Sequence, residues 1–210
     1  MREKRRQRKV EWESFNRRNI VDAVIRILSR QGSAALTMER VADEAGLAKG
    51  TLYAYFKDKK ELLESVKETS LQPMRDELIS LLEGDLSPAL KLEGLIARHL
   101  GYFDENRGFF RVLLWERQLA STHLRRQQST YYQNFVDRIA RVYAEGVKKG
   151  IFKPLDPVKV ALMIIEANIA MVGQRLLKDN PAPVQEDAAL LIEVFMQGVK
   201  APRRARKRQR

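Results

Sequence analysis

One short run of this 210-residue chain concentrates hydroxyl and ammonium side chains where a helix would present them to solvent. Lysine, threonine and tyrosine alternate there with small and apolar residues, at Lys49, Thr51, Tyr53 and Tyr55. Such side chains bind phosphate oxygens, and near the N-terminus of a recognition helix they also reach the edges of bases. The run therefore predicts a surface that contacts the backbone and the groove of a nucleic acid.

The sequence contains few residues that could form a catalytic, metal-binding or cofactor-binding site. The chain has no cysteine, which excludes disulfides, thiolate nucleophiles and cysteine metal sites. Its two histidines, His99 and His123, have no carboxylates at metal-ligand spacing. The sequence also has no nucleophile elbow, P-loop or dinucleotide fingerprint. We therefore expect no catalytic residue, no metal and no cofactor, and a helical enzyme is a remote alternative.

Three predicted helices would position the nucleic-acid contacts. Apolar residues recur at intervals of three and four, which is typical of helices. The first helix is expected to start at a cap on Ser14. The second runs from an N-cap at Thr37 to Gly46, where a positive φ allows a tight turn. The third covers about 48–56, so residues 37–56 are predicted to form a helix-turn-helix.

The same segment resembles the DNA-binding motif of the tetracycline-repressor (TetR) family of bacterial transcription regulators. That family shows a threonine, then Ile/Val-Ala, Ala-Gly, an early glycine in the third helix, Tyr-x-His/Tyr-Phe and Lys-x-x-Leu. The matching residues here are Thr37, Val41-Ala42, Ala45-Gly46, Gly50, Tyr53-Ala54-Tyr55-Phe56 and Lys59 to Leu62. The resemblance implies DNA contacts from Thr37, Lys49, Gly50, Thr51, Tyr53, Tyr55, Lys57 and Lys59, with Phe56 in the core.

Some of these positions have alternatives. Tyr53 and Tyr55 would be packing residues if the motif were absent, and Lys57 is as well explained by a solvated lysine. Ala48 departs from the family, which usually has serine or threonine there. A missing cap hydroxyl costs on the order of 1 kcal/mol and removes a possible contact, although the Ala48 methyl could touch a thymine methyl.

Breaks in the helical pattern divide the rest of the chain. A capping box at Asp58 and Glu61 begins a fourth helix, which reaches about Leu82 with a kink or break at Pro73. Further helices are expected at 88–105, 109–115, 124–149, 158–178 and 184–199. We expect an all-α fold of about nine helices. Its predicted parts are a basic arm at 1–13, a DNA-binding domain at 14–74, an effector-binding and dimerisation domain at 75–199 and a basic disordered tail at 200–210.

In TetR-like proteins the C-terminal half dimerises through its last two long helices and binds a small effector between the others. The resemblance implies a dimer interface here at Ile165, Ile169, Val172, Gly173, Leu191 and Phe195, with burial inside one protomer as the alternative. The candidates for contacts with a small apolar or amphipathic effector are His99, Tyr102, Phe103, Phe110, Trp115, Glu116, His123, Tyr131 and Asn168. For Glu166 and Asn168, which are polar within an apolar helix, pairing at the dimer interface is equally expected.

The excess positive charge is confined to the two ends of the chain. Residues 1–9 carry +5 and residues 200–210 carry +7, which accounts for the whole net charge of +12. Such blocks are expected to be disordered and to bind polyanions without sequence preference. The C-terminal tail could bind a distal DNA segment, RNA or an anionic membrane surface, and the alternative is that both tails are inert.

Deletion of residues 200–210 tests the role of this tail. We expect the truncated protein to bind non-operator DNA more weakly and with a flatter salt dependence, because each neutralised phosphate contributes about 0.9 to the slope. Operator preference should remain. The measurement is affinity against salt concentration, and an unchanged slope would rule out a phosphate-binding tail.

The predicted protein is a soluble, cytoplasmic, nucleoid-associated bacterial regulator. We expect it to bind a palindromic site on double-stranded DNA as a homodimer, most simply as a ligand-responsive repressor. No signal peptide or membrane insertion is expected, because the N-terminus has no apolar segment and the most apolar run, 158–172, is interrupted by polar residues and short. The alternative is a nucleoid-architectural or scaffolding protein of the same fold with weak sequence preference.

Overall fold

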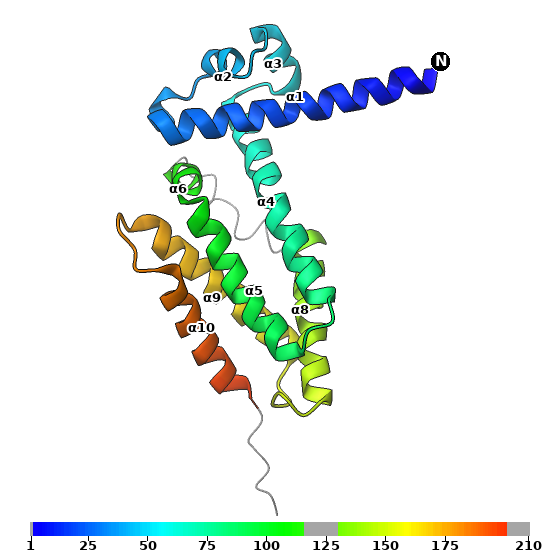
Figure 1. The fold of residues 1–210 in the computed structure, drawn as a ribbon, viewed down its shortest axis with the longest axis vertical. Coiled ribbons are helices and arrows are strands. Elements are labelled where there is room, and N and C mark those ends of the chain that lie inside the picture. The colour runs from blue at the N-terminus through cyan, green and yellow to red at the C-terminus, as the bar shows by residue number, and fades with distance from the viewer. Residues whose placement is uncertain (1, 116–129, 201–210) are drawn as a thin grey trace, which may run out of the picture. The chain divides into compact units, whose positions relative to one another are not determined.

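The computed structural model describes residues 2–115 and 130–200, and the side chains of 15–28, 30–32, 34–114 and 130–200 (Figure 1). Within those residues it contains nine α-helices, one 3-10 turn and no strand. The helices are α1 (Arg2–Gln31), α2 (Met38–Glu44), α3 (Lys49–Tyr55), α4 (Lys59–Glu83), α5 (Pro88–Glu105), α6 (Arg107–Trp115), α8 (Thr130–Lys148), α9 (Pro157–Leu177) and α10 (Val184–Val199). The predicted all-α fold is confirmed.

The chain forms two compact units. The first contains residues 2–73 and 106–115, and the second contains residues 74–105 and 130–200. The division at 73 and 74 lies one residue from the predicted boundary. However, α6 belongs to the first unit, where it packs against α1, although the sequence had assigned it to the C-terminal domain.

The first helix is longer than the sequence predicted. It begins at Arg2, so the predicted start at Ser14 and the predicted disordered arm are wrong for residues 2–13, which continue α1. This stretch has no proline or glycine, and arginine, lysine, glutamate and glutamine are good helix formers. The backbone therefore has no reason to stop at Ser14.

The turn between α2 and α3 has the predicted local chemistry. Thr37 caps α2, and its Oγ accepts a hydrogen bond from the Arg40 N–H at 3.2 Å. Gly46 has a φ of 67°, which allows the Leu47 N–H to donate to the Ala42 carbonyl at 2.9 Å. Ala48 precedes α3 without a side-chain cap. The helix-turn-helix is therefore held by Thr37 and Gly46.

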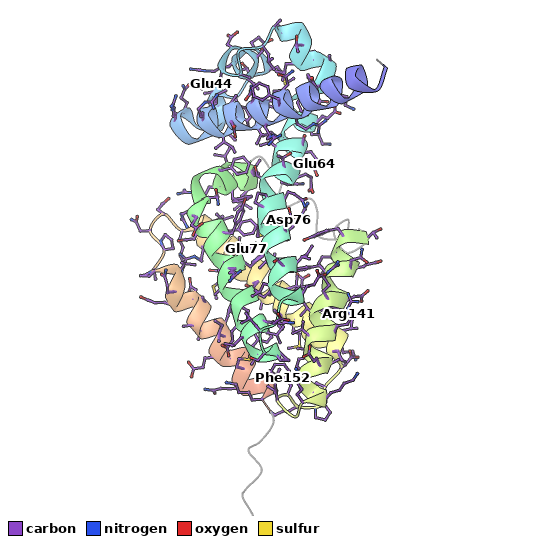
Figure 2. All side chains as sticks on the ribbon, turned by 45° about the vertical axis from the view of Figure 1, so that its right-hand side comes forward. Glu44, Glu64, Asp76, Glu77, Arg141 and Phe152 are labelled. Atoms are coloured by element: carbon purple, nitrogen blue, oxygen red, sulfur yellow. The ribbon has the colours of Figure 1, made fainter. Side chains whose placement is uncertain are left out.

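Two further contacts fix the ends of the motif. Arg26 of α1 donates to a Glu44 carboxylate oxygen at 2.6 Å and to the Glu44 carbonyl at 3.1 Å, which ties α1 to the last residue of α2 (Glu44 is labelled in Figure 2). At the start of α4, the Glu61 N–H donates to Asp58 at 2.8 Å, and the Glu61 carboxylate accepts from the Lys57 N–H at 2.9 Å. The predicted capping box is present, and it closes on Lys57. Pro73 lies inside an unbroken α4.

Helix α9 is the centre of the second unit. It packs against α5, α8 and α10 and buries Val160, Ala161, Ile164, Ile165, Val172 and Leu176. By length and composition alone α9 could span a membrane, and at 21 residues it is longer than the apolar run seen in the sequence. Arg175 is nevertheless buried in it and paired with Asp104 of α5 and Asp187 of α10. A helix that is packed on three sides in this way is a core helix of the unit.

The sequence located most of the second unit's helices closely. The predicted bounds of α5 and α10 agree with the structure, and α9 differs by one residue at each end. Of the predicted helix at 124–149, residues 130–148 are helical, and 124–129 lie outside the described residues. The turn after α8 is held by the ring of Phe152, which stacks on Tyr143 at 5.0 Å and fills the space left by Gly146 (Figure 2).

Candidate nucleic-acid interface

The solvent side of α3 carries most of the predicted DNA contacts. Lys49 opens the helix with 58% of its side chain exposed, Tyr53 is 43% exposed, and Thr51 is half-buried. At Gly50, apart from the neighbouring residues and the backbone of the same helix, no described atom lies within 4 Å of the position that a Cβ would occupy. The underside of α3 is anchored by Leu52, which is fully buried. The helix therefore presents an ammonium, a hydroxyl and a phenol next to open backbone.

Lys49 is engaged by an acid from the other helix of the motif. Its Nζ lies 2.5 Å from Oε1 of Glu39 on α2 and 5.9 Å from the centre of the Tyr53 ring. The hydrogen bond from Lys49 is the main cause that lowers the pKa of Glu39, and the same bond raises the pKa of Lys49. Sequence reasoning missed Glu39, because no periodic pattern links residues 39 and 49 across a turn.

Tyr55 lies differently from Tyr53. It is half-buried, its phenol oxygen accepts a long hydrogen bond of 3.5 Å from Asn16 Nδ2, and its ring centre lies 6.3 Å from that of Phe56. Phe56 is 2% exposed, as expected of a core residue. Packing inside the protein therefore covers part of the Tyr55 side chain, and the Tyr53 side chain is the more exposed of the two. A DNA contact from either residue stays a prediction.

The remaining predicted contacts flank α3. Thr37 is exposed at the start of α2, and Lys57 is exposed between α3 and α4. Lys59 is half-buried as the first residue of α4, where the helix N-terminus favours an anion. Arg40 of α2 is also exposed, and only its charge distinguishes it in the sequence.

Arg17 of α1 joins the first helix to this surface. Its Nη1 donates to the Ser65 hydroxyl of α4 at 3.0 Å, and its guanidinium carbon lies 5.7 Å from the centre of the Phe56 ring. Arg17 thereby contacts both Phe56, which directly follows α3, and Ser65 of α4. A long-range contact of this kind has no signature in the sequence.

Comparison with known proteins decides the family. Residues 20–66 match the family described as bacterial regulatory proteins of the tetR family, and residues 88–177 match the tetracyclin repressor-like C-terminal domain. The chain belongs to the TetR family. It is a DNA-binding transcriptional regulator, as the resemblance of the helix-turn-helix implied.

Similar TetR-family proteins cover nearly the whole chain. The regulator BetI of Rhizobium meliloti is 25% identical over 189 residues, which are 87% of this chain and 88% of that protein. The structure of FadR from Bacillus subtilis in complex with stearoyl-CoA has a TM-score of 0.69 at 20% identity, and covers 86% of this chain and 97% of that one. The structure of AibR in complex with isovaleryl coenzyme A and operator DNA has a TM-score of 0.62 at 15% identity, with 85% and 97% covered. The last two likenesses show the TetR fold.

The predicted effector contacts of this TetR-family chain are brought together only in part. On α5 the Phe103 ring centre lies 5.1 Å from that of His99 and 6.1 Å from that of Tyr102, and burial together with Glu105 raises the pKa of Tyr102. Phe110 is fully buried in the first unit, beside Phe109. The side chain of Trp115 and the residues Glu116 and His123 lie outside the described residues.

The other two candidates, Tyr131 and Asn168, have partners inside the second unit. The Tyr131 ring stacks on Phe135, and the Arg75 guanidinium carbon lies 4.6 Å from the centre of the same ring. Asn168 is 2% exposed and donates to the Ile164 carbonyl at 2.9 Å, while its Oδ1 has no partner among the described residues. Asn168 therefore has one oxygen to offer to a ligand.

Glu166, another polar residue of this helix, accepts a hydrogen bond from the Tyr132 hydroxyl at 2.8 Å. A separate open groove of about 510 Å³ contains none of the predicted effector contacts. It is lined by Asn134, Asp137, Ala140, Arg141, Ala144 and Pro157 (Arg141 is labelled in Figure 2).

The predicted dimer residues divide between buried and partly exposed positions. Ile165 and Val172 are each 7% exposed within one protomer, so the packing of the second unit already buries them. Ile169, Gly173, Leu191 and Phe195 are half-buried. The exposed large apolar side chains of α9 and α10 are instead those of Val158, Met163, Leu177, Leu190 and Val194.

Proposed function

We propose that this protein is a ligand-responsive repressor that binds a palindromic operator as a homodimer. The observation that carries the proposal is the solvent face of α3, where Lys49, Thr51 and Tyr53 follow a tight helix-turn-helix. Each recognition helix enters a major groove, with the two half-sites one or more helical turns apart. The relatives are regulators and not enzymes, and we propose a regulatory role without catalysis, in the cytoplasm and close to the nucleoid.

Selection of bound fragments from genomic DNA tests this proposal. The full-length protein is incubated with sheared DNA at about 0.15 M salt, where non-specific affinity is weak, and the retained fragments are sequenced. A palindromic consensus is the expected result. Broad enrichment without a consensus would instead favour the architectural protein, an alternative that the charge of the two tails supports.

We place the dimer contact on the exposed apolar faces of α9 and α10. Met163, Ala170 and Leu177 recur every seven residues along α9, and Leu190 and Val194 are four apart on α10, so each set shares one helix face. All five are exposed in one protomer. A two-fold pairing of these helices would remove them from water, whereas Ile165 and Val172 have little surface left to bury.

The double substitution Leu190→Glu and Val194→Glu is expected to dissociate the dimer. Both side chains are more than half exposed, so the protomer should keep its fold, but each buried carboxylate would cost several kcal/mol at an interface. The dissociation constant should rise at least about 100-fold, as measured by sedimentation equilibrium. Leu86→Glu, at an exposed leucine between α4 and α5, is the matched control. Dissociation by the control, or none by the double variant, would contradict the placement.

We further propose an amphipathic effector bound in the second unit, and acyl-CoA thioesters are the first compounds to test. Two structural neighbours are complexes with such thioesters, and this chain offers the α5 aromatic cluster of His99, Tyr102 and Phe103 and the free oxygen of Asn168. Ligand sites usually combine an apolar lining with a few polar groups. The effector can release operator DNA only to the extent that it binds the DNA-free conformation of the protein more tightly than the DNA-bound conformation. Mass spectrometry of ligand that co-purifies with the protein is the direct test.

A further inference from the structure

An acidic side chain lies among the groups that are proposed to bind DNA phosphates. Glu39 is in the first turn of α2, and its carboxylate meets the ammonium of Lys49, the first residue of α3, at 2.5 Å. The side chains are 54% and 58% exposed, respectively. The ion pair therefore bridges the two helices of the motif, and more than half of each side chain is exposed to solvent.

The Glu39 carboxylate occupies groups that the motif would offer to a phosphate. The hydrogen bond from Lys49 is the largest cause of the lowered pKa of Glu39. Lys49 is a predicted DNA contact whose ammonium would bind a phosphate. Carboxylate and phosphate oxygens accept charge-assisted hydrogen bonds from the same donors. The geometry of the free protein thus resembles a phosphate complex in which Glu39 replaces the phosphate.

We propose that Glu39 is an intramolecular competitor for DNA phosphate, which holds Lys49 in the free protein and must release it when a duplex binds. This inference rests on the proposed DNA-binding role of α3. After release the carboxylate stays near the duplex, where its charge opposes the backbone. Glu39 therefore lowers the phosphate-driven part of the affinity. Non-operator binding consists almost wholly of that part, so the effect is clearest on a duplex without an operator.

The substitution Glu39→Gln tests the inference because it keeps the size of the side chain and removes its charge. Affinity of the full-length variant for a non-operator duplex should exceed that of the unmodified protein. Each additional neutralised phosphate adds about 0.9 to the slope of log affinity against log salt. The ratio of the two affinities should therefore grow about 3.5-fold per protomer between 200 and 50 mM salt.

Two comparisons separate competition from a general change of charge. Asp43→Asn removes another exposed acid from the same helix, one outside the Glu39–Lys49 pair, and should raise the affinity less than Glu39→Gln. In a Lys49→Gln background, Glu39→Gln should lose most of its effect. Thermal unfolding of each variant verifies that the fold is retained.

Three results would overturn the competitor role: equal effects of Glu39→Gln and Asp43→Asn, a full effect of Glu39→Gln without Lys49, or weaker binding by the Glu39→Gln variant. The last result would mean that Glu39 orients Lys49 for DNA. Failure of the unmodified protein to bind any duplex in a salt-dependent way would refute the proposed function itself. Binding by the unmodified protein with no response to Glu39→Gln would refute only the role of Glu39.

Discussion

Replacement of Arg175 by methionine is expected to lower the free energy of unfolding by about 3 kcal/mol. The Arg175 side chain is 5% exposed, and its Nη2 lies 2.6 Å from Oδ1 of Asp104 on α5, while Nη1 binds Asp187 on α10. Burial opposes the charged form of this guanidinium, but the hydrogen bonds that it donates to Asp104 and Asp187 raise the pKa of Arg175 above its ordinary value. Methionine would leave the carboxylates of Asp104 and Asp187 without their shared cation, which is the costly way to break a buried pair.

Urea unfolding of the full-length protein measures this effect. The control is a triple variant in which Arg175→Met is combined with Asp104→Asn and Asp187→Asn, because it removes the stranded charges together with the cation. The triple variant should recover much of the lost stability, since an uncharged replacement of a whole buried ion cluster is often nearly neutral. Equal loss in the single and triple variants would mean that packing, and not charge, joins α9 to α5 and α10.

Truncation of Phe56 to alanine is expected to destabilise the first unit by about 3–5 kcal/mol and to abolish DNA binding. Phe56 is 2% exposed and follows α3 as its C-cap residue, and the Arg17 guanidinium lies over its ring. Its loss would leave a cavity at the point where α3 meets α4. The expected measurements are a lower urea midpoint and no retained duplex at a protein concentration at which the unmodified protein binds.

Tyr53→Ala provides the matched comparison, because it truncates an aromatic residue of the same helix on the solvent side. With 43% of Tyr53 exposed, stability should fall by less than about 1 kcal/mol, as for most surface substitutions. DNA affinity should still decrease. If Tyr53→Ala were as destabilising as Phe56→Ala, Tyr53 would be a packing residue and α3 would present a different face to DNA.

Local chemistry explains why so much of the fold could be predicted from the sequence. The cap at Thr37, the positive φ at Gly46 and the capping box at Asp58 each depend on residues at most five positions apart. The ends of α5 and the start of α10 were likewise predictable from neighbouring residues, because proline, glycine and asparagine interrupt the helical pattern there. The start of α1 was missed because Ser14 can cap a helix but need not, when the residues before it are themselves good helix formers.

Contacts between distant segments explain what the sequence could not provide. Glu39 and Lys49 meet across a turn, and Arg175 joins Asp104, which is 71 positions away. Neither pair follows a helical period. The sequence also does not show which apolar residues of α9 are buried inside one protomer. Ile165 and Met163 are both apolar, but Ile165 is buried and Met163 is exposed in the folded unit. The exposed residue is therefore the one available to a dimer contact.

The central claim is that the solvent face of α3 reads the DNA sequence, and removal of two hydroxyls from it is the most direct test. Thr51→Val and Tyr53→Phe together keep the shape of the helix and delete its hydroxyl donors. The measured quantity is the ratio of affinities for a selected operator and for a scrambled duplex. We predict that this ratio falls at least about tenfold, which corresponds to about 1.4 kcal/mol of lost base readout, while affinity for the scrambled duplex is nearly unchanged. A double variant with an undiminished ratio would contradict the assignment of sequence recognition to α3.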